Sequence, residues 1–202
     1  MLEIKLEFDA AAFDGATDSF VDGDLQRALI EAVNWTAERV QLAIRASMLT
    51  AFDSPVPYTL GGVALYRATP RADGGEPAAL VFLLDDVAGY LELEQSGGVR
   101  TAGAPGTTRL GPLIPGPAAA VDRFGNLPRN FVANALSEPD VAWENLKPGE
   151  PPALVRKPPG RPLEVLALIA SETHYEARWD FYGEALRAVA DAFPSAPFVL
   201  DT

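Results

Sequence analysis

The sequence contains no cysteine among its 202 residues and only one histidine, His174. The lack of cysteine excludes a disulfide framework, a thiolate metal site and a thiol nucleophile, and it leaves the redox compartment open. A single histidine does not supply the ligands of the common zinc sites. Basic residues are also few, with 16 Lys and Arg against 28 Asp and Glu, a formal net charge of -12. This balance argues against binding of nucleic acid through a large basic surface.

Long hydrophobic runs are missing as well. The longest apolar stretches are residues 77–84 and 165–170, far below the roughly 20 residues that span a bilayer. Residues 1–8 read MLEIKLEF, with charges where a signal peptide needs an apolar core. We therefore expect a soluble protein made in a cytoplasm, with no membrane partner.

The acidic residues that are present concentrate in the first half of the chain. Residues 1–95 carry 16 acidic and 6 basic side chains, whereas residues 96–202 carry 12 and 10. One interpretation is a solubilising surface. The other is an acidic surface that repels a polyanion or docks a basic partner.

The first quarter of the chain predicts a strand and a long helix. Apolar and charged residues alternate over residues 2–8, which is typical of a half-buried strand. Asp22 and Asp24 are candidate N-caps of a helix over residues 23–52 that Pro55 ends. Its apolar stripe consists of Leu25, Leu29, Val33, Val40, Ile44, Met48 and Phe52, widened by Trp35, Leu42 and Leu49.

Three strands are predicted next. Residues 58–68 and 77–84 are strand-like, and the turn residues between them indicate a β-hairpin. The second arm is apolar on both faces, which predicts a central position in a sheet. A third short strand is predicted over residues 90–95, before Gly97-Gly98.

The second half alternates irregular and regular segments. Two arms rich in Pro and Gly, at about residues 101–128 and 147–162, are expected outside the core. A short helix over 130–136 and a buried strand over 163–172 are predicted between and after them. Asp180 begins a final helix whose apolar stripe consists of Phe181, Ala185, Leu186, Val189 and Phe193.

Together these elements predict a single α+β domain over residues 1–202. It would hold a twisted, mostly antiparallel sheet, a long N-terminal helix, a C-terminal helix and extended Pro/Gly-rich arms.

Residues with catalytic potential are sparse. His174 could belong to a Ser-His-acid triad, but the sequence has no Gly-x-Ser-x-Gly motif for the nucleophile. Asp85-Asp86 follows a predicted strand and could hold Mg²⁺, but a solvated turn is the simpler interpretation. No phosphate-binding glycine loop occurs. The basic cluster of Arg156, Lys157 and Arg161 is too small for strong phosphate binding. We expect no catalytic residue, no cofactor and no metal.

Four local patterns occur in a fixed order. They are TAFDSPVPYT at residues 50–59, YL at 90–91 with GGVR at 97–100, DRFGN at 122–126, and THYEARWDF at 173–181. In this order and spacing the chain resembles the minor tail protein Z family, the tail completion proteins of long-tailed phages and prophages. The similarity runs from about residue 24 to 195. Each pattern is weak alone, and their order makes the set fairly specific.

The resemblance implies a structural virion protein at the head-proximal end of a tail, in the virion neck. It implies a homo-oligomeric ring, a hexamer matching the tail tube, that contacts tail terminator, tail tube and connector or stopper proteins while DNA passes through its lumen. It implies no enzyme. The positions that match the family patterns, expected to determine fold and assembly, are Phe52, Pro55, Pro57, Tyr58, Tyr90, Leu91, Gly97, Gly98, Arg100, Gly125, Asn126, Tyr175, Arg178, Trp179 and Phe181.

Two alternatives stay open. The first is also structural: the chain is the tail terminator or the stopper ring itself. The second belongs to another class, a small soluble hydrolase in which His174 acts with Asp85 or Asp86.

The acidic charge agrees with the ring that the resemblance implies. An acidic lumen would let DNA slide through the ring without binding, because like charges form no phosphate contacts.

Overall fold

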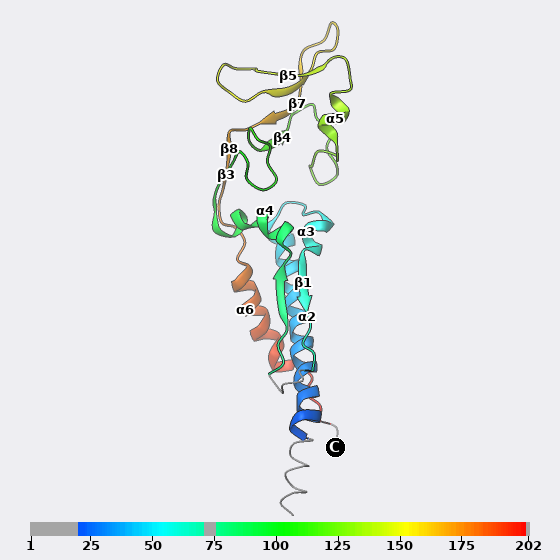
Figure 1. Cartoon of the computed structure of the whole chain (residues 1–202), viewed down its shortest axis with the longest axis vertical. Coiled ribbons are helices and arrows are strands. Elements are labelled where there is room, and N and C mark those ends of the chain that lie inside the picture. The colour runs from blue at the N-terminus through cyan, green and yellow to red at the C-terminus, as the bar shows by residue number, and fades with distance from the viewer. Residues whose placement is uncertain (1–19, 71–75, 201–202) are drawn as a thin grey trace, which may run out of the picture. The chain divides into compact units, whose positions relative to one another are not determined.

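The computed structural model describes residues 20–70 and 76–200 and shows an α+β fold (Figure 1). Where the sequence predicts one domain, the chain divides into two compact units. Among the described residues, unit 1 comprises residues 20–45, 63–70, 76–82 and 182–200, and unit 2 comprises Ala46–Gly62 and Leu83–Phe181. The strand predicted over residues 2–8 and most of the turn between residues 69 and 76 lie outside the described residues.

The long N-terminal helix is confirmed. It is α2 (Gln26–Ala51), and a short π-helix, η1 (Phe20–Leu25), precedes it. Its buried residues recur every three to five positions and include Ala28, Ala32, Ala37, Val40, Ile44 and Met48. Leu42 and Leu49, expected to widen the buried stripe, are instead 60% and 59% exposed. No helix among residues 20–70 and 76–200 has the length and apolar character that crossing a membrane requires.

Unit 1 pairs two short strands, β1 (Val63–Tyr66) and β2 (Leu80–Leu83). The pairing agrees with the predicted hairpin, but two details of the prediction are wrong. Residues 57–61 form helix α3 (Pro57–Gly61) of unit 2, because Pro57 suits the first turn of a helix. β2 belongs to a two-stranded sheet, so it is not central, and Leu80 is 55% exposed.

Polar side chains of α2 attach β1 and the residues after it to the helix. Asn34 donates to the carbonyl of Ala68 at 3.0 Å and accepts from its N–H at 2.7 Å. Gln41 and Arg45 both donate to the carbonyl of Val63 at 2.8 Å. The strand segment is therefore fixed to α2 at both ends.

The predicted C-terminal helix is α6 (Phe181–Ala192), and a 3-10 turn, η2 (Phe193–Ser195), continues it. No residue of α6 is buried. Leu186, Val189 and Phe193 of the predicted stripe are 71%, 41% and 58% exposed. The predicted helix is therefore present, and its apolar stripe is largely exposed.

Helix α4 (Asp85–Ser96) of unit 2 replaces the strand predicted over residues 90–95. The alternation of Leu and Glu at residues 91–94 imitates a strand. However, Val87, Leu91 and Glu94 are buried at helical spacing. Asp85 and Asp86 occupy the first turn of the helix, where carboxylates are favourable. The prediction of a solvated turn at these residues is therefore wrong.

Two antiparallel sheets complete unit 2. The smaller pairs β3 (Gly98–Thr101) with β8 (Glu172–Tyr175). The larger has the strand order β4 (Leu113–Pro115), β7 (Glu164–Ile169), β6 (Ala153–Arg156) and β5 (Val141–Glu144). Helix α5 (Phe131–Ala135) lies beside this sheet (Figure 1). The helix and the sheet share a cluster of buried residues, which consists of Ala135, Val141, Leu154, Leu166 and Ala167.

Both Pro/Gly-rich arms contribute a strand to the larger sheet. The first arm supplies β4, and the second supplies β6, which pairs with a strand on each side. Leu154 and Val155 of β6 are fully buried. The expectation that both arms lie outside the core therefore fails at β6, because three apolar residues between prolines are enough for a central strand of this length.

Candidate functional site

The four sequence patterns meet around one cavity of unit 2, with a volume of about 260 Å³. We call its lining the motif corner. The first pattern contributes residues 52–56 and Thr59, the second Tyr90 and Leu91 with the nearby Glu94, the third Phe124 and Asn126, and the fourth Arg178. Segments far apart in the sequence thus form one surface.

An ion pair between Glu94 and Arg178 links α4 to the segment after β8. The Nε and Nη2 groups of Arg178 donate to the two carboxylate oxygens of Glu94, the Nη2 bond measuring 3.1 Å. The Glu94 side chain is 11% exposed and that of Arg178 is 46% exposed. The hydrogen bond from Arg178 to Glu94 raises the pKa of the guanidinium, which stays charged. This is a planar, two-point contact of the kind that fixes orientation.

The backbone reinforces the same junction. The N–H groups of Arg178 and Trp179 donate to the carbonyl of Glu94 at 2.9 Å and 3.1 Å. The last four carbonyls of a helix have no partner within the helix. The fourth pattern therefore caps the C-terminal end of α4. Both the carbonyl and the carboxylate of Glu94 accept hydrogen bonds from this pattern.

Trp179 forms the apolar part of this junction. Its side chain is buried, and its ring packs edge-on against Phe52, with centroids 5.4 Å apart, and against Phe181 at 5.6 Å. The indole N–H donates to the hydroxyl of Ser47 at 2.9 Å. A buried Trp needs such a partner. The contacts join the end of α2 to the start of α6.

Tyr90 connects the second pattern to the first. Its hydroxyl lies 2.7 Å from that of Thr59, which is buried. Burial raises the pKa of Tyr90, and the hydrogen bond with Thr59 acts in the opposite direction. Arg100 donates to the Tyr90 carbonyl at 2.8 Å, and its guanidinium lies 4.7 Å from the ring centroid of Tyr175. Arg100 of β3 therefore links α4 to β8.

The glycine pair after α4 is required by the backbone. Gly97 caps the helix with φ +70°, and a Cβ there would lie 3.3 Å from the backbone nitrogen of Ala177. Gly98 has φ +130° and pairs with Tyr175. Side chains rarely adopt these angles. The pair thus lets α4 turn directly into β3.

The third pattern is a self-contained loop. The Asp122 carboxylate accepts from the N–H groups of Phe124 at 2.8 Å and Asn126 at 3.0 Å. Gly125 supplies φ +80°. This is the local bonding that Asp favours in turns. The loop presents Phe124 and Asn126 to the cavity, with Arg123 stacked on Phe124.

The predicted positions differ in how directly they take part. Phe52, Pro55, Tyr90, Leu91, Asn126 and Arg178 line the cavity. Pro57 opens α3, and Tyr58 beside it is 61% exposed. Glu94 lies in none of the four patterns, and Thr59 ends the first pattern but is not among the positions singled out. The helical spacing of Val87, Leu91 and Glu94 is the signal that could have identified Glu94.

The residues of the alternative hydrolase site lie on different elements of unit 2. His174 lies on β8, its side chain is 73% exposed, and Glu172 is its neighbour at 2.9 Å. Asp85 and Asp86 lie at the start of α4. Among residues 20–70 and 76–200, no group of three or more His, Asp or Glu side chains could hold a metal ion.

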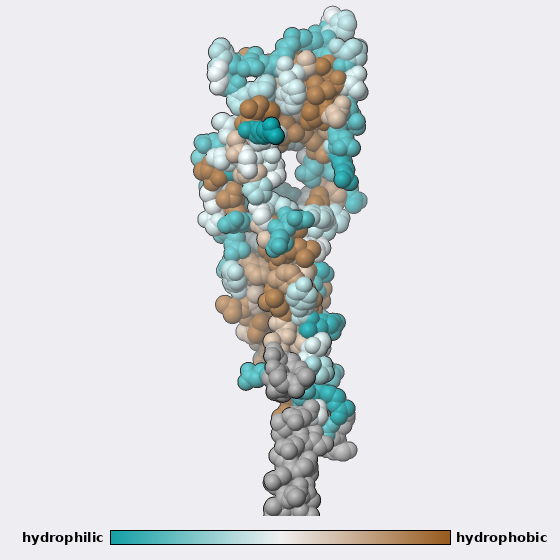
Figure 2. Space-filling view, in the orientation of Figure 1, coloured by the Kyte–Doolittle hydropathy of each residue, from teal (hydrophilic) through white to brown (hydrophobic). Residues whose placement is uncertain are grey.

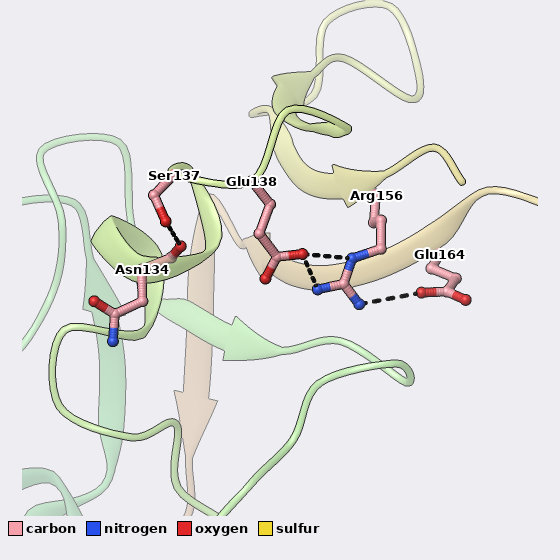
Figure 3. Close-up of polar contacts among 5 residues, drawn as sticks. All are labelled: Asn134, Ser137, Glu138, Arg156 and Glu164. Carbon is pink, nitrogen blue, oxygen red and sulfur yellow. Dashed lines mark hydrogen bonds and ion pairs between the residues drawn. The ribbon is translucent and has the colours of Figure 1, made fainter. Parts of the chain in front are cut away.

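Two members of the basic cluster, Arg156 and Lys157, form ion pairs with carboxylates, and Figure 3 shows those of Arg156. Arg156 donates to Glu138 at 2.6 Å and 3.1 Å and lies 3.5 Å from Glu164. The hydrogen bond to Glu138 raises the pKa of Arg156. Lys157 pairs with Glu144. The pair between Arg156 and Glu164 joins the inner strands β6 and β7, and these contacts offset the positive charge of Arg156 and Lys157.

The chain was compared with family models, curated proteins and solved structures. No family model, no curated protein and no solved structure matches it.

Proposed function

We propose that the chain is a structural virion protein that completes the head-proximal end of a phage tail and joins it to the head–tail connector. In this proposal six copies form a ring around the DNA channel. The ring contacts tail terminator, tail tube and connector or stopper proteins. It assembles in the host cytoplasm and acts in the virion neck, and it performs no chemical reaction.

One observation supports the proposal above the others: the four patterns that carry the family resemblance converge on the motif corner. Chance matches to the four family patterns would have no reason to lie around one cavity. Patterns that a shared fold requires are expected to lie close together. The corner's contacts are those of a structural junction, namely a helix cap, an ion pair and a packed Trp.

A fixed junction suits a ring subunit. Identical copies close into a ring only if each presents the same two surfaces at the same angle. Contacts between α4, the end of α2 and the segment before α6 hold three chain segments in one geometry. The charge of residues 1–95 adds to the proposal, because an acidic wall would let DNA pass without phosphate contacts.

The test is removal of this gene product from the phage or prophage that encodes it, followed by low-dose imaging of the particles. We expect separate heads and tails, or joints that break on purification. Normal, stable head–tail joining without the protein would contradict the proposal. Tails of uncontrolled length would instead favour the tail terminator, and joined particles that lose DNA would favour the stopper.

Complementation sharpens this experiment. Tyr58 belongs to the first pattern yet is 61% exposed, so its side chain is accessible to a partner subunit. We expect Tyr58→Ala to lower the yield of joined particles while leaving the free energy of unfolding within about 0.5 kcal/mol of wild type. Leu42→Ala, which truncates a side chain of α2 that is 60% exposed and lies outside the patterns, is the control and should restore wild-type joining.

A further inference from the structure

Strand β2 of unit 1 has an open edge. Among the strands of the described residues, β2 pairs with β1 alone. The N–H of Leu84, directly after β2, donates to the carbonyl of Gly62, directly before β1, at 2.9 Å, so the two strands are antiparallel. Successive residues of such a strand direct their backbone groups to opposite edges. Val81, three positions before Leu84, therefore directs its N–H and carbonyl away from β1, where they can pair with a further strand.

An apolar groove of about 250 Å³ adjoins β2. It is lined by α2, β2 and α6 with η2, and its large side chains are Val33, Val40, Val81, Val189 and Phe193. Thr36 also lines it, but its hydroxyl already donates to the carbonyl of Ala32 at 2.8 Å. Apolar side chains are visible over the part of the surface where β2 and α6 lie (Figure 2). Among the described residues β1 contributes nothing to the lining, so the groove belongs to the open side of β2.

The chain contains a segment that matches both features. Residues 2–8 lie outside the described residues, and their sequence alternates apolar and charged side chains. In an extended conformation one face would consist of Leu2, Ile4, Leu6 and Phe8. The other face would consist of Glu3, Lys5 and Glu7. The first face suits the groove, the second suits water, and the backbone between them suits the open edge of β2.

The length of chain before Phe20 allows this segment to reach the groove. Val33 and Val40 lie roughly 20 and 30 Å from Phe20 along η1 and α2, at about 1.5 Å per residue. Residues 9–19 can span up to about 36 Å when extended. A segment on so short a tether has an effective concentration in the millimolar range. This favours the chain's own segment over the same segment of a second copy.

The direction of the strands gives the segment its orientation. Gln41 donates to the carbonyl of Val63, whereas Asn34, earlier in α2, donates to that of Ala68. β1 therefore runs toward the start of α2, and the antiparallel β2 runs away from it. Because residue 8 leads to Phe20 at the start of the helical segment, the connection is shortest when residues 2–8 lie antiparallel to β2.

We propose that residues 2–8 bind along the open edge of β2 of the same chain as a third, antiparallel strand, with Ile4 and Leu6 in the groove. The pairing satisfies the backbone groups of the open edge and covers part of Val189 and Phe193, which are 41% and 58% exposed. It concerns unit 1 alone, so it holds whether or not the proposed function is correct.

The first test measures hydrogen exchange of the Val81 amide in the full chain. We expect slow exchange in the wild type and exchange at least about tenfold faster when Ile4→Ala and Leu6→Ala are combined, because the apolar face is lost. The matched control combines Glu3→Ala and Glu7→Ala on the opposite face of the same segment, and exchange there should change less than about twofold. Circular dichroism checks that α2 is retained in both variants.

Three results would overturn the pairing. They are fast exchange at Val81 in the wild type, no acceleration when Ile4 and Leu6 are replaced, and equal acceleration in the control.

The second test identifies which copy supplies the strand and uses the absence of native cysteine. Lys5→Cys is combined with Leu80→Cys, which is 55% exposed on the face of β2 opposite Val81. A bismaleimide spanning about 8 Å, the separation of diagonal neighbours on one face of adjacent strands, should link the two within one chain of 21.5 kDa.

The control combines Lys5→Cys with Leu42→Cys, a similarly exposed position of α2 that should link poorly. Links between two chains, at twice the mass, would assign the edge to a second copy and overturn the proposal. Equal linking to both positions, or none at Leu80→Cys, would overturn the pairing itself.

Discussion

The motif corner of unit 2 and the α6 stripe of unit 1 both contain aromatic and aliphatic side chains, and they differ in how these are used. In the corner, Trp179 is 4% exposed and contacts Phe52, Phe181 and Ser47. In the stripe, Leu186 is 71% exposed. Composition therefore does not separate the two regions; the presence of partners from other segments does.

Backbone hydrogen bonding accounts for much of this difference. The end of α4 leaves carbonyls that need donors, and the segment containing Arg178 and Trp179 supplies them through Glu94. That segment carries the aromatic ring with it into the interior. In α6, by contrast, no residue is buried, and the apolar row stays at the surface.

The largest effect is expected for Trp179→Ala. It leaves a cavity beside Phe52 and removes the partner of Ser47, so the free energy of unfolding of unit 2 should fall by about 3–5 kcal/mol. Leu186→Ala, measured by the same chemical denaturation, should change the free energy of unfolding by less than about 1 kcal/mol. Equal losses in the two variants would show that the corner is no more buried in solution than the stripe.

Glu94→Gln should have the next largest effect. The amide keeps the shape but loses the charge that Arg178 binds, and we expect a loss of about 2 kcal/mol, moderated because Arg178 is half-exposed. Thermal or urea unfolding measures it. Glu150→Gln, which breaks the surface pair with Lys147, is the control and should change stability by at most about 0.5 kcal/mol. A loss below that of the control would mean that the Glu94 contact contributes little.

Gly97→Ala tests the turn that joins α4 to β3. A side chain at φ +70°, with its Cβ 3.3 Å from the nitrogen of Ala177, should cost about 1–2 kcal/mol in urea unfolding. Gly61→Ala is the control, because a Cβ there meets nothing within 4 Å and the residue lies in α3. It should be neutral or slightly stabilising. A neutral Gly97→Ala would contradict the positive φ at this position.

The smallest effect concerns the pH dependence of Tyr90. Burial raises its pKa above the ordinary value of 10.0, so in strongly basic solution the unfolded chain ionises first. The contribution of Tyr90 is complete below pH 10.0 and is lost as the pH rises through the raised pKa. Tyr90→Phe should cost about 1 kcal/mol at neutral pH by losing the bond to Thr59, and should flatten the alkaline decline.

The control for this titration is Tyr66→Phe, which changes an exposed tyrosine of unit 1. It should keep the alkaline decline of the wild type. Unfolding free energies measured at several values from about pH 8 to pH 11 give both curves. The same decline in Tyr90→Phe as in the wild type would assign it to other groups.

The sequence predicted the α+β class, α2, β2, α5, β7 and α6 from periodicity and caps. The sequence prediction failed where the two-residue spacing of a strand and the helical spacing occur in the same segment. Residues 91–94 alternate Leu and Glu as a strand does, yet they form the end of α4, because Glu94 gains a partner in Arg178 only as a helix residue. It also failed at β6, where flanking prolines concealed a central strand.

The candidate site was partly predictable. Matching patterns identified the residues of the motif corner, but order and spacing carry no information on which segments meet. Thr59 and Glu94 were not singled out because their partners are distant in the sequence. Tyr90 lies 31 residues after Thr59, and Arg178 lies 84 residues after Glu94. Contacts across such separations depend on how α3, α4 and the segment after β8 are placed, and no local pattern encodes that.

The sequence by itself determined the chemical limits of this protein: no thiol chemistry, one histidine, an acidic charge balance and amphipathic helices at both ends. The tertiary structure decided which apolar faces are covered. Amphipathic spacing fixes only that one side of a helix is apolar. Whether that side is buried depends on another segment reaching it, as Trp179 reaches Phe52 and as nothing in the described chain reaches Leu186.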